Sequence, residues 1–343
     1  MKSAIPERCL VPSTARSLLH LAVDFGLLAG LYVLSWNAPA ALVPLFWFAQ
    51  GTILWALFVV GHDCGHGSFS RRPWINTLVG HLTHTPLLVP YHAWRLSHRI
   101  HHRHTGDIGR DEGWHPLTAA EVDALPAHVR FLRFRLPLLA FPFYLARRSP
   151  NRIGSHFRPR SVLFRPRERR RVATSVVLCG AFLVVLLTSA LFAGPVALVR
   201  WYVGPYLVFV VWIDLVTYLH HTDASLPWYR NGGWTFEKGA LSTVDRRYGL
   251  FERLHHDAGC HVVHHLFPAI PHYRLREAAA AIRPMLGARY REDQRPIWRA
   301  LLEAIGSCEV VPAVGAVVHY EPRVTADAVA PLGSEAAPRP ATR

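Results

Sequence analysis

The amino-acid sequence predicts an all-α integral membrane protein, with four transmembrane helices in two hairpins and a helical cap on the cytoplasmic side. Of its 343 residues, 51% are hydrophobic, and the mean hydropathy of +0.15 is more apolar than that of a typical soluble domain. Apolar stretches of membrane-crossing length occur in two pairs, each followed by a basic segment. We expect residues 1–320 to form one domain and residues 321–343, rich in alanine, proline and threonine, to be a disordered tail.

The first hairpin is expected at residues 17–36 and 40–61, because each stretch is close to the ~20 apolar residues that a helix needs to cross the hydrocarbon core. The second hairpin is expected at residues 173–195 and 200–219. Two carboxylates fall inside these spans and, because a charge is costly in lipid, each should face the bundle interior or a polar cavity. They are Asp24 and Asp214.

Basic residues set the expected orientation. The net charge is +15, and arginines crowd the segment between the hairpins, including RPRERRR at 165–171. By the positive-inside rule this segment and both termini lie in the cytoplasm, and we expect a multi-pass protein of the bacterial inner membrane. The chain lacks an aromatic-basic platform or recognition motif, so lipid headgroups are favoured over nucleic acid. Residues 131–146 are apolar but interrupted by Arg133, Arg135 and two prolines, which favours an interfacial helix with snorkelling arginines.

Three histidine boxes lie near the ends of the expected membrane helices: HDCGH at 62–66, HRIHH at 98–102 and HVVHH at 261–265. On a helix, positions i, i+3 and i+4 share one face, so each box aligns two or three imidazoles. The boxes hold more imidazoles than one octahedral ion accepts, which indicates two metal ions sharing the set. Imidazole suits zinc, copper, nickel and iron.

The surrounding residues narrow the metal chemistry. A structural zinc site closes with four ligands, commonly thiolates, but the five cysteines are scattered without a CxxC pair. Their scatter also favours a reducing, cytoplasm-facing site over a disulfide framework. A metal transporter would place its histidines near the membrane midplane, whereas these boxes lie beyond the ends of the spans. A nitrogen-rich, dinuclear site at the membrane boundary suits redox chemistry with dioxygen on a lipid.

Six stretches carry a resemblance to a known family: GHDCGHGSFS, LVPYHAWRLSHRIHHRHTG, DEGWHPL, LPWYR, TVDRRYG and HVVHHLFPAIPHY. They resemble the membrane fatty-acid desaturases, in particular the acyl-lipid omega-3 and delta-12 branch, over roughly residues 40–285. The resemblance implies a non-haem di-iron enzyme that uses dioxygen and two electrons to introduce a cis double bond into an acyl lipid. Its electrons would come from a separate carrier protein of the ferredoxin or cytochrome b5 type.

Carried over by position, the resemblance assigns nine iron ligands and no further catalytic residue. One of them comes from TYLHHT at the end of the fourth span, where His221 stands next to His220. The full set is His62, His66, His98, His101, His102, His221, His261, His264 and His265.

Other residues near the boxes keep more than one interpretation. His255 and His256 either bind an ion, support a ligand, or are hydrogen-bonded structural groups. Several carboxylates either contact a ligand ring or are exposed, capping or structural groups: Asp63, Asp107, Asp111, Glu112 and Asp245. Four aromatic residues are expected to anchor the membrane interface: Trp94, Trp114, Trp228 and Tyr229.

Within the resembled branch, HHLFPAIPHY and LPWYR favour omega-3 over delta-12 selectivity. The alternatives are a delta-12 desaturase and a fatty-acid hydroxylase on the same scaffold. A small shift of the substrate carbon relative to the irons would favour oxygen rebound over removal of a second hydrogen.

Overall fold

The computed structural model describes residues 1–113, 115–149, 152–230 and 232–323. Within these residues, four helical spans are long and apolar enough to cross a membrane. They are Thr14–Ser35, Ala40–His66, Pro166–Ala193 and Pro195–His221. The prediction of an all-α membrane protein with two hairpins is therefore confirmed.

The first hairpin consists of α1 (Thr14–Ser35) and α2 (Val43–His66). Ser13 caps α1, because its hydroxyl accepts a hydrogen bond from the backbone N–H of Arg16. The α2 helix continues beyond the apolar run that predicts it. It ends where Gly67 adopts a left-handed conformation with φ of 78°, which glycine reaches without steric cost. The first histidine box therefore forms the last turn of a membrane helix.

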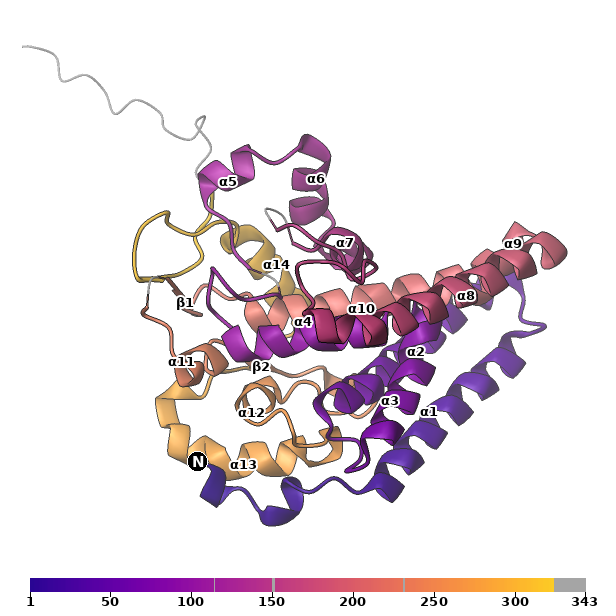
Figure 1. The fold of residues 1–343 in the computed structure, drawn as a ribbon, viewed down its shortest axis with the longest axis horizontal. Helices are drawn as coiled ribbons and strands as arrows, with labels where there is room; N and C mark the ends of the chain where they lie inside the picture. The colour runs from indigo at the N-terminus through magenta and orange to yellow at the C-terminus, as the bar shows by residue number, and fades with distance from the viewer. Residues whose placement is uncertain (114, 150–151, 231, 324–343) are drawn as a thin grey trace, which may run out of the picture.

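The second hairpin consists of α8 (Arg169–Ala193), α9 (Pro195–Leu198), the π-helical η7 (Val199–Val203) and α10 (Gly204–His221). These helices project to the right of Figure 1. The outer ends of the two hairpins are joined by polar contacts to the backbone. The Trp47 indole donates to the carbonyl of Arg200 at 2.8 Å, and the Arg200 guanidinium donates to the carbonyl of Ala38 at 2.7 Å.

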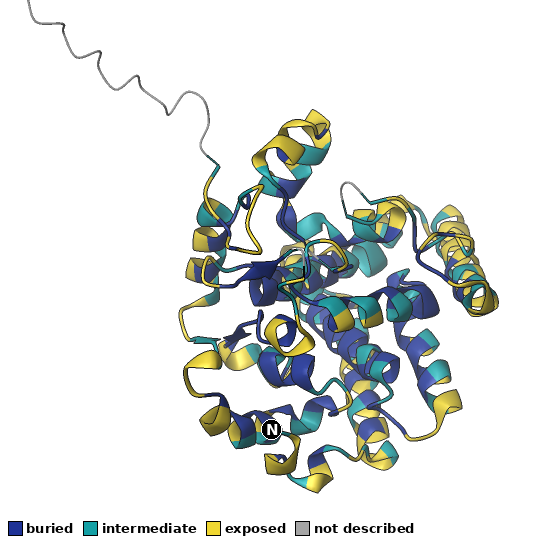
Figure 2. Cartoon of the chain, turned by 60° about the vertical axis from the view of Figure 1, so that its left-hand side comes forward, coloured by how far each residue is buried: buried dark blue, intermediate teal, exposed yellow. Residues whose placement is uncertain are grey.

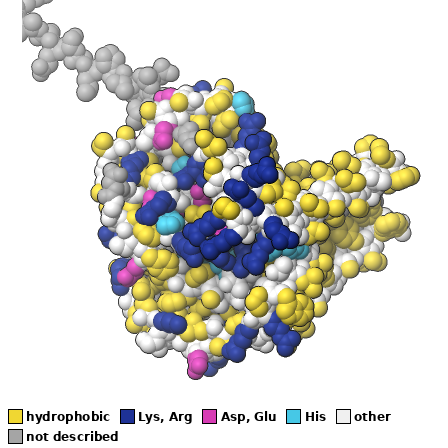
Figure 3. Space-filling view, viewed as in Figure 1, with side chains coloured by type: hydrophobic (Ala, Val, Ile, Leu, Met, Phe, Trp, Pro, Cys, Tyr) yellow, Lys and Arg dark blue, Asp and Glu magenta, His cyan; other side chains and the backbone are white. Residues whose placement is uncertain are grey.

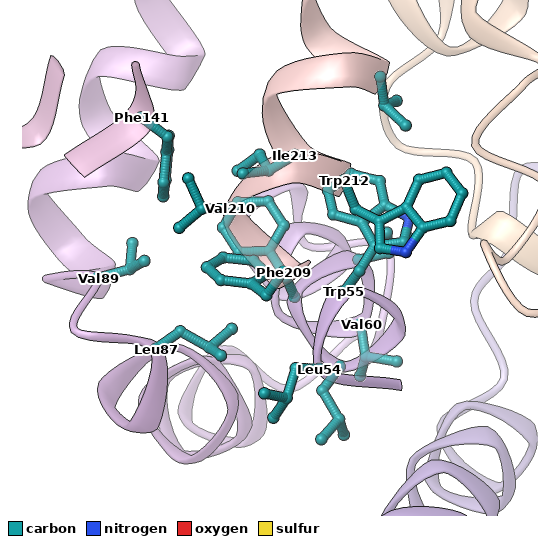
Figure 4. Packing of buried hydrophobic residues seen from close by; sticks show 14 of the residues in the cluster. Leu54, Trp55, Val60, Leu87, Val89, Phe141, Phe209, Val210, Trp212 and Ile213 are labelled. Atoms are coloured by element: carbon teal, nitrogen blue, oxygen red, sulfur yellow. The ribbon is translucent and has the colours of Figure 1, made fainter. Parts of the chain in front are cut away.

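The main hydrophobic core lies where α2 packs against α10 and α3 (Pro73–His84). Figure 4 shows Trp55 of α2 beside Trp212 of α10, with Phe209 of α10 near the centre of the same cluster. Large aromatic rings bury much apolar surface and stiffen such a contact. This core holds the ends of α2 and α10, and hence their histidines, in fixed positions.

The two carboxylates inside the membrane spans both have polar partners. The Asp214 carboxylate accepts a hydrogen bond from the backbone N–H of Phe141 at 3.0 Å. Asp24 is buried, and its Oδ2 lies 2.6 Å from Nε2 of His256. Both side chains therefore find the polar contact that the cost of a charge in lipid requires.

A glycine makes the close approach of α2 and α10 possible. A Cβ atom at Gly51 would lie 2.4 Å from Cβ of Val208 and 2.6 Å from the carbonyl oxygen of Pro205. We therefore expect Gly51→Ala to destabilise the protein by about 1–3 kcal/mol, because the helices must move apart. Gly30→Ala is the matched control, since nothing lies within 4 Å of its added carbon. Thermal unfolding in detergent should show a lower midpoint for Gly51→Ala alone, and equal midpoints would contradict the prediction.

The remaining elements form the cap, on the left of Figure 1. Its helices are α4 (Tyr91–His104), α5 (Ala119–Asp123), α6 (Ala127–Arg135), α7 (Phe141–Arg147), α11 (Phe236–Ala240), α12 (His261–Leu266), α13 (Leu275–Leu286) and α14 (Ile297–Ser307). Strands β1 (Trp228–Tyr229) and β4 (Val317–Val318) pair antiparallel, whereas β2 (Asp245–Arg246) and β3 (Glu292–Asp293) pair parallel. Figure 2 shows that buried residues concentrate in the middle of the molecule.

The single continuous helix predicted at residues 131–146 does not form, whereas its expected position at the membrane interface stays a prediction. The chain there forms α6, the 3-10 helix η5 (Pro137–Leu139) and α7, because the prolines interrupt the helical hydrogen bonds. Arg133 does not snorkel: its side chain is buried and donates to the carbonyl of His115 at 2.8 Å. In the predicted tail, Glu321 pairs with Val310, and residues 324–343 lie outside the described residues.

Candidate metal centre

The end of α2 supplies two imidazoles, His62 and His66, one helical turn apart. Their Nε2 atoms lie 3.2 Å from each other. Spacing of i and i+4 puts the two rings on one face of the helix, and Gly67 then turns the chain away. The box thus extends the apolar helix by one turn and aims both rings into the cap.

The second box lies on α4, which packs against α2, α3 and α8. His98 and His102 are one turn apart, with their Nε2 atoms separated by 3.1 Å. His101 points to a different side of the helix, toward α10 and α12, where its ring lies 4.7 Å from that of His221. Trp94 stacks on His98 at 4.5 Å between ring centroids.

The remaining imidazoles come from the end of α10 and from α12. His221 is the last residue of α10, and α12 carries His261, His264 and His265. The short α12 helix is capped by Asp245, whose Oδ1 accepts the backbone N–H of Val262 at 2.7 Å. An anionic cap also suits the positive end of the helix dipole.

The nine predicted histidines form two adjacent clusters. In the first cluster, the candidate ligand atoms lie within 4.8 Å of one another. Its members are His62, His66, His98, His102 and His264. In the second cluster, His101, His221 and His265 meet the same limit, and Nε2 of His261 lies 3.0 Å from the Nε2 atoms of both His221 and His265. The clusters touch where the rings of His102 and His265 stack at 4.2 Å.

The spacing of the nitrogens fits a pair of metal ions. Ligands at about 2.0–2.1 Å from a shared ion lie about 3.0 Å apart in octahedral and about 3.4 Å apart in tetrahedral geometry. The Nε2 atoms of neighbouring rings lie 3.0–3.2 Å apart. Burial lowers the pKa of His98, His102 and His264 well below the usual value, and that of His261 and His265 likewise. Neutral imidazoles with free lone pairs are what metal binding requires.

Two side chains outside the boxes fix the orientation of a ring. The carboxylate of Asp111, which is fully buried, accepts a hydrogen bond from Nδ1 of His101 at 2.6 Å. The hydroxyl of Thr105 lies 3.0 Å from Nδ1 of His265. Each contact occupies Nδ1 and leaves Nε2 for the cluster, as in carboxylate–histidine–metal arrangements. The sequence reasoning named Asp111 and missed Thr105, although Thr105 directly follows the second box.

The other carboxylates named from the sequence do not hydrogen-bond a ring of the nine. Asp107 accepts from the backbone N–H of Gly109 and pairs with Arg110, and Glu112 pairs with Arg148 and Arg152. Asp245 caps α12. Asp63 Oδ1 is 3.7 Å from Nδ1 of His62, which exceeds hydrogen-bond distance.

Neither His255 nor His256 joins the two clusters. The ring of His255 packs 4.3 Å from that of Trp212, and both its nitrogens are buried without a hydrogen-bond partner among the described residues. His256 contacts Asp24. His220 uses both nitrogens elsewhere, Nδ1 with the carbonyl of Val244 at 2.5 Å and Nε2 with Tyr248 at 3.1 Å.

The expectation that aromatic residues anchor the interface is wrong for the described ones, because three of the four are buried. Trp94 has 5% of its surface exposed and packs against the first cluster. The other two are Trp228 and Tyr229 of β1. Trp114 lies outside the described residues.

Comparison with known proteins gives a consistent result. A family model described as fatty acid desaturase matches residues 18–296. The sn-1 acyl-lipid omega-3 desaturase (ferredoxin) of Synechocystis sp. is 51% identical over 322 residues, covering 94% of this chain and 90% of that protein. The protein of the same name from Nostoc sp. is 49% identical, covering 93% and 89%. The acyl-lipid omega-3 desaturase (cytochrome b5), endoplasmic reticulum, of Arabidopsis thaliana is 46% identical, covering 94% and 86%.

Proposed function

This chain belongs to the fatty acid desaturase family, and from that premise we propose that it is an acyl-lipid omega-3 desaturase. It is an oxidoreductase that uses dioxygen and two electrons to form a cis double bond. The observation that carries the proposal is the pair of adjacent imidazole clusters at the ends of membrane helices. The omega-3 selectivity is supported by the names of the relatives that cover most of the chain.

The proposed reaction converts R–CH2–CH2–R′, O2, two electrons and two protons into R–CH=CH–R′ and two waters. Two iron ions would supply the reductive activation of dioxygen, a capacity that amino-acid side chains lack. The first cluster, of five histidines, would hold one ion, and the second cluster, of four histidines, would hold the other.

The chain's own residues position the rings and exclude water. Asp111 and Thr105 each hold one ring with its Nε2 toward a cluster. Trp94 lies between His98, at 4.5 Å, and Phe58 of α2, at 5.0 Å, and so separates the first cluster from the apolar core. Water excluded from such a site cannot quench a reactive oxidant. An acyl chain would approach from this apolar side.

The electrons are proposed to come from a separate carrier of the ferredoxin type. The relatives from Synechocystis and Nostoc carry ferredoxin in their names, whereas the one from Arabidopsis carries cytochrome b5. Figure 3 shows Lys and Arg side chains gathered over the middle of the cap. A basic surface of this kind attracts an acidic carrier and speeds its encounter with the site.

The function is tested by expression in a host without polyunsaturated lipids, supplied separately with oleate or linoleate and with a ferredoxin system. New alpha-linolenate from linoleate, located by mass spectrometry, is the expected result. Linoleate from oleate with no triene would assign a delta-12 desaturase, and a hydroxylated chain as main product would assign a hydroxylase. Cells with the empty vector control for the host's own enzymes.

We also propose that both termini and the histidine boxes face the cytoplasm of a bacterial cell, with the protein in the inner membrane. The start of α1 and the end of α2 must lie on one side of a hairpin, as must the start of α8 and the end of α10. The arginines of the segment between the hairpins favour the cytoplasm for this side. The projecting helices in Figure 3 carry mostly hydrophobic side chains, as lipid contact requires.

Cysteine labelling tests this topology. Arg72 and Asn37 are both exposed, at the box end and at the turn of the first hairpin respectively. We expect a membrane-impermeant maleimide to label Asn37→Cys in intact spheroplasts and to label Arg72→Cys only after permeabilisation. The unmodified chain, with its native cysteines, measures background. The opposite pattern of labelling would reverse the orientation.

A further inference from the structure

Three more histidines meet outside the two clusters. His20 lies on α1, His256 on the loop before α12, and His272 at the start of the 3-10 helix η9 (His272–Arg274). One candidate ligand atom from each lies within 4.8 Å of the others. The rings of His256 and His272 are 4.3 Å apart, and that of His20 lies 4.8 Å from His272. The proposed reaction assigns no role to these three side chains.

Two of the three rings are oriented by buried carboxylates. Asp24 Oδ2 lies 2.6 Å from Nε2 of His256, and Asp63 Oδ2 lies 2.9 Å from Nδ1 of His272. Asp63 also accepts the backbone N–H of His272 at 2.9 Å. Each carboxylate therefore occupies one ring nitrogen and leaves the other available. This is the pattern that prepares a histidine for metal binding, and the same pattern joins Asp111 to His101.

The second ring nitrogen of His272, Nε2, is not occupied by the Asp63 carboxylate. This atom is buried and lacks a hydrogen-bond partner among the described residues, and the residue as a whole is 2% exposed. A buried polar atom without a partner is costly.

Two buried carboxylates lie beside the three rings and favour the binding of a cation there. Asp24 and Asp63 are buried, at 5% and 3% exposure, and the ion pairs found for them in the described part of the chain are with histidines only. Burying a carboxylate is costly unless a nearby cation compensates it. One divalent ion among the three imidazoles would balance both carboxylates.

We propose that His20, His256 and His272 bind a third metal ion, a divalent cation of the zinc class, separate from the two irons. Three imidazoles with one open position for water form a common zinc shell, and the site needs no redox change. The ion would join α1 to the loop and to η9. Through Asp63, which neighbours His62, it would steady the end of α2.

The backbone at His256 fits this role. His256 and Asp257 adopt φ of 51° and 54°, a left-handed conformation that non-glycine residues seldom take. Such residues persist where surrounding contacts hold them, often at ligand sites. Here the turn directs the imidazole of His256 toward α1 instead of toward the two clusters.

The test is metal analysis of the purified holoprotein from cells grown with iron and zinc. We expect two irons and one zinc per chain in the unaltered protein. His20→Ala and His272→Ala should lose zinc at least fivefold and keep iron, whereas His264→Ala should lose iron and keep zinc. His128→Ala, an exposed change on α6, should keep both.

Absence of a third metal from the unaltered protein, even after dialysis against zinc, would overturn the proposal. Loss of zinc in His264→Ala but not in His20→Ala would also overturn it, because that zinc would occupy the histidine boxes. Retained iron reports that a variant is folded. If neither variant folds, X-ray absorption at the zinc edge of the unaltered protein identifies the atoms that bind the zinc. Three imidazole ligands would support the proposal, and sulfur ligands would contradict it. Product analysis is independent of this metal count, so failure of either proposal is recognised separately.

Discussion

Replacing His264 with alanine is expected to reduce desaturation by more than about 100-fold, beyond the loss seen when an outer partner of a metal ligand is removed. Nε2 of His264 lies 3.1 Å from Nε2 of His102 within the first cluster. The four other imidazoles of that cluster lie on α2 and α4, and His264 is its one member from α12. None of the four can therefore take the position of the His264 ring. The protein should also bind about one iron fewer per chain.

The measurement pairs product analysis with iron content for the same preparations. His128→Ala removes an exposed histidine far from the boxes in sequence and should retain both activity and iron. Full desaturation by His264→Ala, or loss of activity with two irons still bound, would show that this side chain is not a metal ligand. The thermal midpoint separates loss of metal from global unfolding.

Sequence alone predicts the membrane spans and the nine histidines because both signals are local. Apolar runs of fixed length define α1, α2, α8 and α10, and the i, i+3, i+4 spacing together with the family resemblance selects the imidazoles. The sequence of the boxes does not show which of their histidines belongs to which cluster. His98 and His102 enter the first cluster, whereas His101 enters the second.

The third box divides in the opposite way. His261 and His265 enter the second cluster, and His264 enters the first. In both boxes the pair one full turn apart stays together and the middle residue turns aside, by the 100° step of a helix. Each of α4 and α12 therefore lies between the two clusters and serves both. That partition depends on how the helices are docked, which no single box encodes.

Contacts between distant segments were the other features that sequence could not supply. His20 meets His272 across 252 positions of chain, and neither stands in a box. The preference of tryptophan for the membrane interface predicts that Trp94 lies there, yet Trp94 packs on His98. Propensity describes an isolated helix, whereas tertiary packing decides which face of α4 is covered.

Replacing Asp111 with alanine is expected to lower activity by about 10–100-fold and to weaken iron binding in the second cluster. Asp111 Oδ1 accepts from Nδ1 of His101 at 2.6 Å and from the backbone N–H of Gly113 at 2.8 Å, while Oδ2 accepts from the N–H of Gly106 at 3.0 Å. Without the carboxylate, the His101 ring loses the contact that keeps Nε2 toward the cluster. Asp111 is thus a positioning residue.

Two further variants distinguish positioning from general structural support. Asp111→Asn should be intermediate: its amide oxygen can still accept from His101, but its amide NH2 then opposes the N–H of Gly106. Asp107→Asn is the matched control, because Asp107 lies in the same turn and contacts Gly109 and Arg110 instead of a histidine. We expect iron content and activity to rank Asp107→Asn above Asp111→Asn above Asp111→Ala. If all three lose stability alike and iron equally, the carboxylate of Asp111 only supports the turn, and His101 does not depend on it for its orientation.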